Sequence, residues 1–337
     1  MVSDSFDTPI GRLNGLRPKK RASIILDMAA IKPRYGVYTP LVTFFNDDES
    51  IDFEATLSHA KRMADSGVLG LVLQGSNGEA PHLDHDERKA LVRAVRDRLN
   101  NLGYTHLQLI VGCGAASVKE TVRYISEAKE SGADYALVLP PAYWVAAMNA
   151  SVIEGFFCDV AAISELPILI YNFPGVTGGI DISSDSIIRL AQADSKIIGC
   201  KLTCGNVGKL QRISSTLPAE SFAAFGGKSD FFLPALVAGS NGIIAALANV
   251  APKTHIELLR LWEKGDLKAA QALQSRLSHA DWALSKVGIA GVKAVVSHHF
   301  GYGIGKGRRP LGVATIESLS EDIVSSIQAV VEIEKKL

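Results

Sequence analysis

The run IIGCKLTCG (residues 197–205) opens like a buried strand but carries a lysine, Lys201, at its fifth position. Seven other short apolar runs lie between residues 36 and 247. Most are apolar almost throughout, which is typical of parallel strands covered on both faces. The eight predicted strands are GVYTPLVTF (36–44), VLGLVLQG (68–75), LQLIVG (107–112), YALVLP (135–140), PILIYN (167–172), KIIGCK (196–201), SFAAFG (221–226) and GIIAAL (242–247).

Helical patterns separate these strands. Capping motifs, in which Asp or Ser is followed three residues later by Glu, occur at 84–87, 117–120 and 151–154. Eight alternating strand–helix units predict an α/β fold, a (β/α)8 TIM barrel with a C-terminal helical extension. An open doubly wound sheet is the alternative, but no dinucleotide-type glycine fingerprint follows the first strand.

The chain after the last predicted strand is helical throughout. Helical patterns cover 252–263, 266–286, 288–300 and 315–336, and the first of them completes the barrel. We therefore expect three parts in the chain. They are an N-terminal extension (1–34), the (β/α)8 barrel (35–260) and a C-terminal helical region packed on the barrel (261–337).

Composition narrows the class of protein. The 337 residues include 35 basic and 35 acidic side chains, so no net field attracts nucleic acid or an anionic membrane. No apolar run reaches the roughly 18 residues of a membrane span. Four cysteines without a disulfide spacing favour a reducing, intracellular compartment. We predict a cytoplasmic protein, with a mitochondrial location as the alternative, because residues 1–34 are basic but Asp4 and Asp7 oppose a transit peptide.

Lys201 ends the sixth predicted strand, and active sites of these barrels lie at the C-terminal strand ends. Burial disfavours the charged form of a lysine, and a neutral amine attacks a ketone to form a Schiff base. The protonated imine can then accept the electrons of a breaking C–C bond. A lone lysine more often pairs with a carboxylate, so the neighbouring residues have to support a catalytic role.

Polar residues at neighbouring strand ends provide that support. Tyr171 ends the fifth predicted strand and can move the protons of imine formation, although a buried, hydrogen-bonded tyrosine is the ordinary alternative. Thr203 lies at the same rim, and we expect it to bind a substrate hydroxyl. The turn after the second strand offers hydroxyl, amide and backbone N–H donors for a substrate carboxylate, although these are also common turn residues. The turn consists of Gly75, Ser76, Asn77 and Gly78.

These segments together resemble a known family. GSNGE (75–79), YNFPGVTG (171–178), IIGCK (197–201) and GG (226–227) are similar to motifs of the dihydrodipicolinate synthase / N-acetylneuraminate lyase superfamily of class I aldolases. The likeness runs from about residue 36 to residue 315. It implies that Lys201 is the Schiff-base lysine.

The resemblance also implies roles for other residues. Tyr171 is similar to the tyrosine that shuttles protons, and Ser76 and Asn77 occupy the positions that hold the substrate carboxylate. Backbone groups of Gly227 and Ile244 would face the lysine and the substrate. Tyr143 resembles an aromatic residue that enters the proton relay of an adjacent subunit across a tight dimer. The resemblance therefore implies a homo-oligomer, commonly a dimer of dimers.

Departures from the family pattern bear on the substrate. The lysine-biosynthetic synthases have an arginine where this chain has Val176, and a glutamate where it has Leu202, so lysine biosynthesis is disfavoured. GSNGE, ALANV (246–250) and VGIAGVK (287–293) resemble the 4-hydroxy-2-oxoglutarate aldolase branch instead. GVYTPLVTFF (36–45) and PGVTG (174–178) also resemble fungal 2-keto-3-deoxy-sugar-acid aldolases.

We predict a Schiff-base-forming lyase that cleaves or forms a C–C bond in a 4-hydroxy-2-oxo acid, giving pyruvate and an aldehyde. Its partner would be a small pyruvate-type 2-oxo acid, and the imine with Lys201 would take the place of a cofactor. We expect no metal site, because HLDHD (82–86) matches no zinc spacing and is typical of a capped helix start. The same residues also suit a condensation or a dehydration, and a catalytically silent barrel that acts as a binding protein is the alternative from another class.

Overall fold

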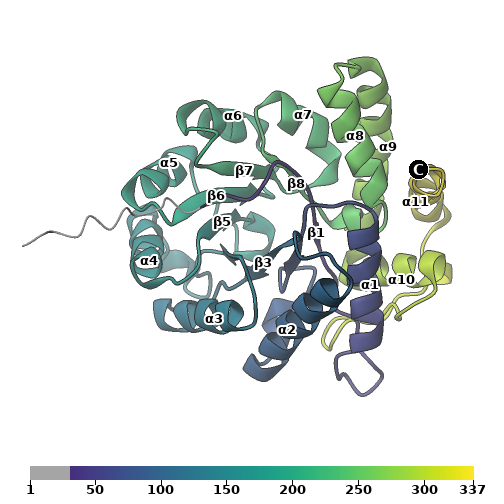
Figure 1. Ribbon diagram of the computed structural model, residues 1–337, viewed down its shortest axis with the longest axis horizontal. Coiled ribbons are helices and arrows are strands. Elements are labelled where there is room, and N and C mark those ends of the chain that lie inside the picture. The colour runs from purple at the N-terminus through teal and green to yellow at the C-terminus, as the bar shows by residue number, and fades with distance from the viewer. Residues whose placement is uncertain (1–30) are drawn as a thin grey trace, which may run out of the picture.

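The computed structural model describes residues 31–337 and shows a closed barrel of eight parallel strands in chain order (Figure 1). Each strand pairs with the next, and β1 closes the barrel against β8. The strands are β1 (Gly36–Pro40), β2 (Gly70–Leu73), β3 (Gln108–Gly112), β4 (Tyr135–Val138), β5 (Ile168–Asn172), β6 (Ile197–Leu202), β7 (Ala223–Gly226) and β8 (Gly242–Ile244). The predicted TIM barrel is thus confirmed, while residues 1–30 of the predicted extension lie outside the described residues.

Helices surround the barrel, as Figure 1 shows. The α-helices are α1 (Phe53–Asp65), α2 (His85–Asn101), α3 (Val118–Glu130), α4 (Ala150–Ile163), α5 (Ser184–Ala193), α6 (Val207–Thr216), α7 (Phe232–Val237), α8 (Pro252–Glu263), α9 (Leu267–Ser285), α10 (Gly288–Phe300) and α11 (Glu321–Glu334). Short 3-10 helices occupy several loops: η1 (Ala80–His82), η2 (Val145–Ala147), η3 (Pro174–Val176), η4 (Ser229–Phe231), η5 (Ala246–Asn249) and η6 (Ile316–Ser318). Within residues 31–337, none of the helices combines the length and the apolarity that crossing a bilayer requires.

The C-terminal helices α9, α10 and α11 lie on one side of the barrel, near α1 and α8 (Figure 1). Helices α8 and α10 have the predicted bounds, whereas the predicted helix 315–336 divides into η6 and a shorter α11. Ser320, with an extended backbone, separates these two helices. The three-part division of the chain stays a prediction.

Helix capping agrees with the sequence at two of three predicted positions. The Asp84 side chain accepts the N–H of Glu87, and the Glu87 side chain accepts the N–H of Asp84, which is the predicted reciprocal box. At 117–120 only the Ser117 side chain makes its capping bond. The box predicted at 151–154 is wrong, because α4 begins two residues earlier with Asn149 as its N-cap.

The interior of the barrel positions the active-site candidates. Side chains such as Tyr38, Leu169 and Phe225 fill it. On the neighbouring strands β5 and β6, Tyr171 lies directly opposite Lys201 in the register. Both therefore project from equivalent levels at the C-terminal end of the barrel. The predicted first strand (36–44) is longer than β1 because residues 41–44 stay buried but leave the ladder to form a loop at the same rim.

Candidate active site

Lys201 lies in the interior, near the end of β6, with only 2% of its surface exposed. Its Nζ donates a hydrogen bond to the phenol oxygen of Tyr171 at 3.2 Å and lies 4.3 Å from the centre of the tyrosine ring. Tyr171 is itself 3% exposed and stacks at an angle against Phe173. An amine and a phenol thus share one water-poor space, in which proton transfer between them requires no large movement.

The two groups face a cavity of about 300 Å³ at the C-terminal end of the barrel. Six predicted site residues line it: Ser76, Asn77, Tyr171, Lys201, Thr203 and Gly227. They come from the loops or strand ends of β2, β5, β6 and β7, while α9 and α10 supply a further wall. The structure therefore brings together residues that are more than a hundred positions apart in the chain.

The GSNG turn after β2 is a compact hydrogen-bonded loop. The Gly78 N–H donates to the Gly75 carbonyl at 3.0 Å, and the Glu79 N–H donates to the Ser76 carbonyl at 3.2 Å. A Cβ atom on Gly78 would lie 2.9 Å from the backbone nitrogen of Gln74, so the close approach of the two chain segments requires glycine. This packing presents Ser76 and Asn77 to the cavity.

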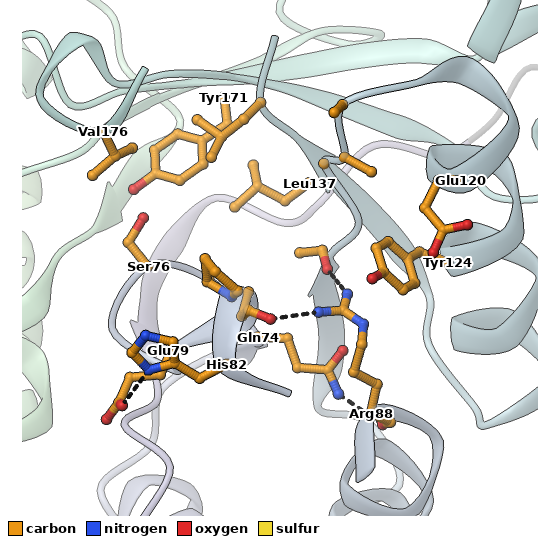
Figure 2. A pocket seen from close by; sticks show the side chains of 18 of the residues that line it. Gln74, Ser76, Glu79, His82, Arg88, Glu120, Tyr124, Leu137, Tyr171 and Val176 are labelled. Carbon is orange, nitrogen blue, oxygen red and sulfur yellow. Dashed lines mark hydrogen bonds and ion pairs between the residues drawn. The ribbon is translucent and has the colours of Figure 1, made fainter. Parts of the chain in front are cut away.

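A second cavity, of about 530 Å³, adjoins the first and shares Ser76, Tyr171, Val176 and Ile289 with it. Figure 2 shows the hydroxyl groups of Ser76 and Tyr171 pointing toward one another at one end of this space. Gly75 also lines it. It extends from the Tyr171 side of the site between the loops that follow β2 and β3.

Arg88 lies at the other end of the second cavity (Figure 2). Its guanidinium donates to the carbonyl oxygens of Ala80 and Gly112 and stacks 4.0 Å from the ring centre of Tyr124. Burial lowers the pKa of Arg88. Through these two hydrogen bonds Arg88 links the loop after β2 to the end of β3.

Gly227, directly after β7, permits a close contact with Thr203. A Cβ atom on Gly227 would lie 2.7 Å from the backbone nitrogen and Cα of Thr203, and closer still to its Oγ1. The Gly227 N–H donates to the Leu202 carbonyl at 3.1 Å, and the Thr203 hydroxyl lies 3.5 Å from the Gly227 carbonyl. Ile244 ends β8 with its side chain in the barrel core beside Phe225, and it does not line the cavity.

Tyr143 lies apart from the other predicted site residues. It belongs to the loop after β4, is 79% exposed and makes an edge-to-face contact with Trp144, which is 69% exposed. Neither ring lines the Lys201 cavity. Within residues 31–337 of this single chain, Tyr143 is therefore not part of the site.

A buried ion pair that the sequence did not predict lies beneath the GSNG turn. Lys293 of α10 forms an ion pair with Glu79, and both side chains are fully buried. Glu79 has a left-handed backbone conformation (φ 56°), and its carboxylate also accepts the Arg308 N–H at 2.9 Å. The Arg308 guanidinium in turn pairs with Glu87 at 2.6 Å. These contacts fasten the segment after α10 to the loop that carries Ser76 and Asn77.

The sequence offered little to identify this ion pair. Glu79 belongs to the motif GSNGE, and Lys293 belongs to the motif VGIAGVK. The two residues are 214 positions apart in the chain. A lysine in an apolar helical pattern is more often at a solvent-exposed edge. The cavity wall holds a further unpredicted charged residue, Asp281 of α9.

Comparisons with known proteins place this site in a family. Residues 33–330 match the Dihydrodipicolinate synthetase family. A probable mitochondrial 4-hydroxy-2-oxoglutarate aldolase of Emericella nidulans is 41% identical over 302 residues, covering 90% of this chain and 96% of the relative. An L-threo-3-deoxy-hexylosonate aldolase of Hypocrea jecorina is also 41% identical, covering 90% and 98%. The two names agree with the predicted aldolase activity and with both predicted substrate classes.

Solved structures agree with the sequence relatives. The crystal structure of a putative dihydrodipicolinate synthase family protein from Coccidioides immitis superimposes with a TM-score of 0.80 at 34% identity, covering 91% of this chain and 99% of that one. The resemblance inferred from the four motifs is therefore confirmed. This chain belongs to the dihydrodipicolinate synthetase family.

Proposed function

We propose that this protein is a class I aldolase that cleaves a 4-hydroxy-2-oxo acid into pyruvate and an aldehyde, or joins them in the reverse direction. The observation that carries the proposal is the buried amine of Lys201, 3.2 Å from the phenol of Tyr171, at the wall of a cavity large enough for a six-carbon acid. The names of the two relatives at 41% identity support it.

The first half of the reaction forms the imine. The Lys201 amine attacks the C2 ketone, and the resulting carbinolamine loses water to give a protonated imine. Both steps add a proton to the former ketone oxygen, and the first step also takes a proton from the attacking nitrogen. Tyr171 lies within hydrogen-bond reach of the Lys201 nitrogen, and the Ser76 hydroxyl points toward the Tyr171 hydroxyl (Figure 2).

The second half breaks the C–C bond. A base removes the proton of the C4 hydroxyl, the C3–C4 electrons move into the imine, and the aldehyde leaves. The remaining enamine takes a proton at C3, and water then releases pyruvate and regenerates the Lys201 amine. The covalent imine supplies the electron sink, so the proposed reaction uses no separate cofactor.

In this proposal the GSNG turn binds the carboxylate of the substrate. Ser76 and Asn77 present side-chain donors at the cavity wall, close to Tyr171. Val176 lines the same cavity. The family resemblance implies that the lysine-biosynthetic synthases have an arginine at this position, which binds a second carboxylate. The valine side chain cannot bind a second carboxylate, so this part of the cavity does not favour a lysine-biosynthetic condensation.

We propose a homo-oligomer, as the family resemblance implies, in which Tyr143 enters the site of an adjacent subunit. Its 79% exposure, together with that of Trp144, supports a role outside its own chain's cavity. The location in the cell also stays a prediction. The word mitochondrial in the name of the Emericella nidulans relative favours the mitochondrial alternative.

Trapping with borohydride tests the mechanism. The protein is incubated with pyruvate, reduced with borohydride and digested, and the modified peptide is identified by mass spectrometry. We expect a pyruvate-derived mass on Lys201 that is absent from Lys201→Ala. Tyr171→Phe retains the ring but loses the proton shuttle, so trapping should be slower by about 10²–10⁴-fold.

Lys196 provides the matched control. It ends the loop before β6, and its amine donates to the carbonyl oxygens of Ala161 and Ser164, far from the C-terminal rim. Lys196→Arg should therefore be trapped like the wild type. An adduct on a lysine other than Lys201, or equal trapping rates for wild type and Tyr171→Phe, would contradict the mechanism.

A further inference from the structure

Asp281 is a buried carboxylic acid at the wall of the Lys201 cavity. It lies near the C-terminal end of α9 and is 7% exposed. The other charged side chains that line this cavity are Lys201 and Lys228. The chemistry proposed above assigns no role to Asp281, so its position in the site needs a separate explanation.

A purely structural role explains Asp281 poorly, because other residues already hold α9 against η4. Gln274 accepts the Leu233 N–H at 2.7 Å and donates to the Ser229 carbonyl at 2.8 Å. Ser278, one turn further along α9, donates to the Asp230 carbonyl at 2.9 Å. Asp281 follows on the same face, where it accepts the N–H of Asp230 over a long distance of 3.4 Å and has the Ser229 side chain as a second hydrogen-bond partner.

The carboxyl group of Asp281 therefore has unused acceptor capacity toward the cavity. Burial, together with the nearby Asp230 carboxylate, raises the pKa of Asp281 to about 6, while Lys228 opposes this rise. Asp281 is then mostly ionised at neutral pH. Asp230 adds a second acidic group behind it, and the buried Oδ1 of Asp230 has no hydrogen-bond partner within residues 31–337.

This local charge discriminates between two kinds of aldehyde. Asp281 lines this end of the cavity whereas Asp230 does not, and burial raises the pKa of Asp230, so the repulsion of a second substrate carboxylate there would come from Asp281. A hydroxyl group would instead donate a charge-assisted hydrogen bond to the Asp281 oxygen. The two substrate classes named for the relatives differ in this respect, since one ends in a carboxylate and the other in hydroxylated carbons.

The course of the substrate through the cavity brings its aldehyde half toward this end. The imine fixes C2 at Lys201, and the GSNG turn holds the C1 carboxylate. Within the Lys201 cavity, carbon atoms from C4 onward can then extend along the remaining wall, which includes Thr203, Lys228 and Asp281. Building on the proposed function, we propose that Asp281 binds a hydroxyl of the aldehyde half and makes the enzyme select a polyhydroxylated 3-deoxy-2-oxo acid over a dicarboxylate.

Substrate profiles of the full chain test this assignment. Initial rates of pyruvate release are measured with a 3-deoxy-2-oxo-hexonate, with 4-hydroxy-2-oxoglutarate and with 4-hydroxy-2-oxopentanoate. The aldehyde half of the last compound carries neither a further hydroxyl nor a carboxylate. Wild type is compared with Asp281→Leu, which removes the hydrogen bond, and with the isosteric Asp281→Asn, which removes the charge and keeps one acceptor oxygen while the other becomes an NH2 donor.

We expect wild type to prefer the hexonate. Asp281→Leu should lower kcat/KM for the hexonate by about tenfold or more, mainly through KM, because it removes a hydrogen bond to a charged group. The pentanoate rate should change by less than about twofold. Asp281→Asn should raise kcat/KM for 4-hydroxy-2-oxoglutarate relative to the hexonate, since the repulsion is gone.

Two outcomes would overturn the proposal. Equal loss on all three substrates would make Asp281 a structural residue, and Asp281→Asn reports on this even when Asp281→Leu folds poorly. A wild-type preference for 4-hydroxy-2-oxoglutarate that Lys228→Met abolishes would show that Lys228, and not Asp281, selects the substrate. Failure of the proposed function itself appears separately, as the absence of a borohydride-trapped pyruvate adduct on Lys201 of the wild type.

Discussion

Replacing Lys293 by methionine tests whether the buried ion pair with Glu79 stabilises the fold beneath the GSNG turn. Both side chains are fully buried, and methionine keeps most of the side-chain length while it removes the charge. The Glu79 carboxylate would then stay in the interior with two partners, the Arg308 N–H at 2.9 Å and His82 Nδ1 at 3.0 Å.

The decrease in the free energy of unfolding can be estimated from these contacts. Removing one member of a buried ion pair costs about 3–5 kcal/mol, and the two partners that remain for Glu79 place the expected loss near the lower end, at about 3 kcal/mol. With an unfolding entropy of about 2.1 cal/mol/K per residue, this loss corresponds to a Tm lower by about 4–5 °C. Burial lowers the pKa of Lys293, and the Glu79 carboxylate opposes that shift. Removal of Glu79 would therefore leave the pKa of Lys293 lower still.

Urea unfolding at neutral pH, followed by far-UV circular dichroism, measures the change. Lys61→Met is the matched control, because Lys61 pairs with Asp65 at 2.6 Å on the surface, where the two side chains are 44% and 41% exposed. An exposed pair of this kind contributes at most about 0.5 kcal/mol. The two variants therefore remove the same chemical group from environments that differ mainly in burial.

A double-variant cycle isolates the interaction. Glu79→Gln and Lys293→Met are each expected to destabilise the protein, and the combined variant should be less destabilised than the sum of the two. The single variants should also bind pyruvate more weakly, because the turn that follows β2 carries Ser76 and Asn77. The reasoning fails if Lys293→Met is as stable as Lys61→Met, or if the two single losses simply add.

Two other predictions concern the rim and the interior. Gly227→Ala should lower stability by about 1–3 kcal/mol and reduce pyruvate trapping, because the new Cβ would lie 2.7 Å from the Thr203 backbone; a variant that unfolds and traps like the wild type would contradict this. Burial lowers the pKa of His59 from 6.5 to about 3, so its neutral ring gives stability that is complete above pH 6.5 and lost as pH falls toward 3. Urea unfolding between pH 6.5 and 3 should show that the free energy of unfolding falls more steeply with pH in the wild type than in His59→Gln. Parallel pH profiles would show that His59 does not cause the loss.

The amino-acid sequence alone was enough to predict the barrel and the placement of Lys201 and Tyr171 at one rim of it. Apolar runs, helix caps and strand ends are local patterns, and α8 and α10 begin and end where those patterns predict. Parallel strands in a barrel bring their C-terminal ends to one rim, so Lys201 and Tyr171 could be expected to lie close together. Strand lengths were less predictable, because residues such as Leu41 and Phe44 are buried in a loop as fully as they would be in a strand.

The remaining features depend on contacts between distant segments. Glu79 meets Lys293 only because the helical region after the barrel folds back over the loop that follows β2. Asp281 reaches the cavity wall only because Gln274 and Ser278 fasten α9 to η4. Periodicity records which face of a helix is apolar, but it carries no information about which distant loop that face will meet. The burial of these charges, and the substrate selection that we propose for Asp281, depend on tertiary packing.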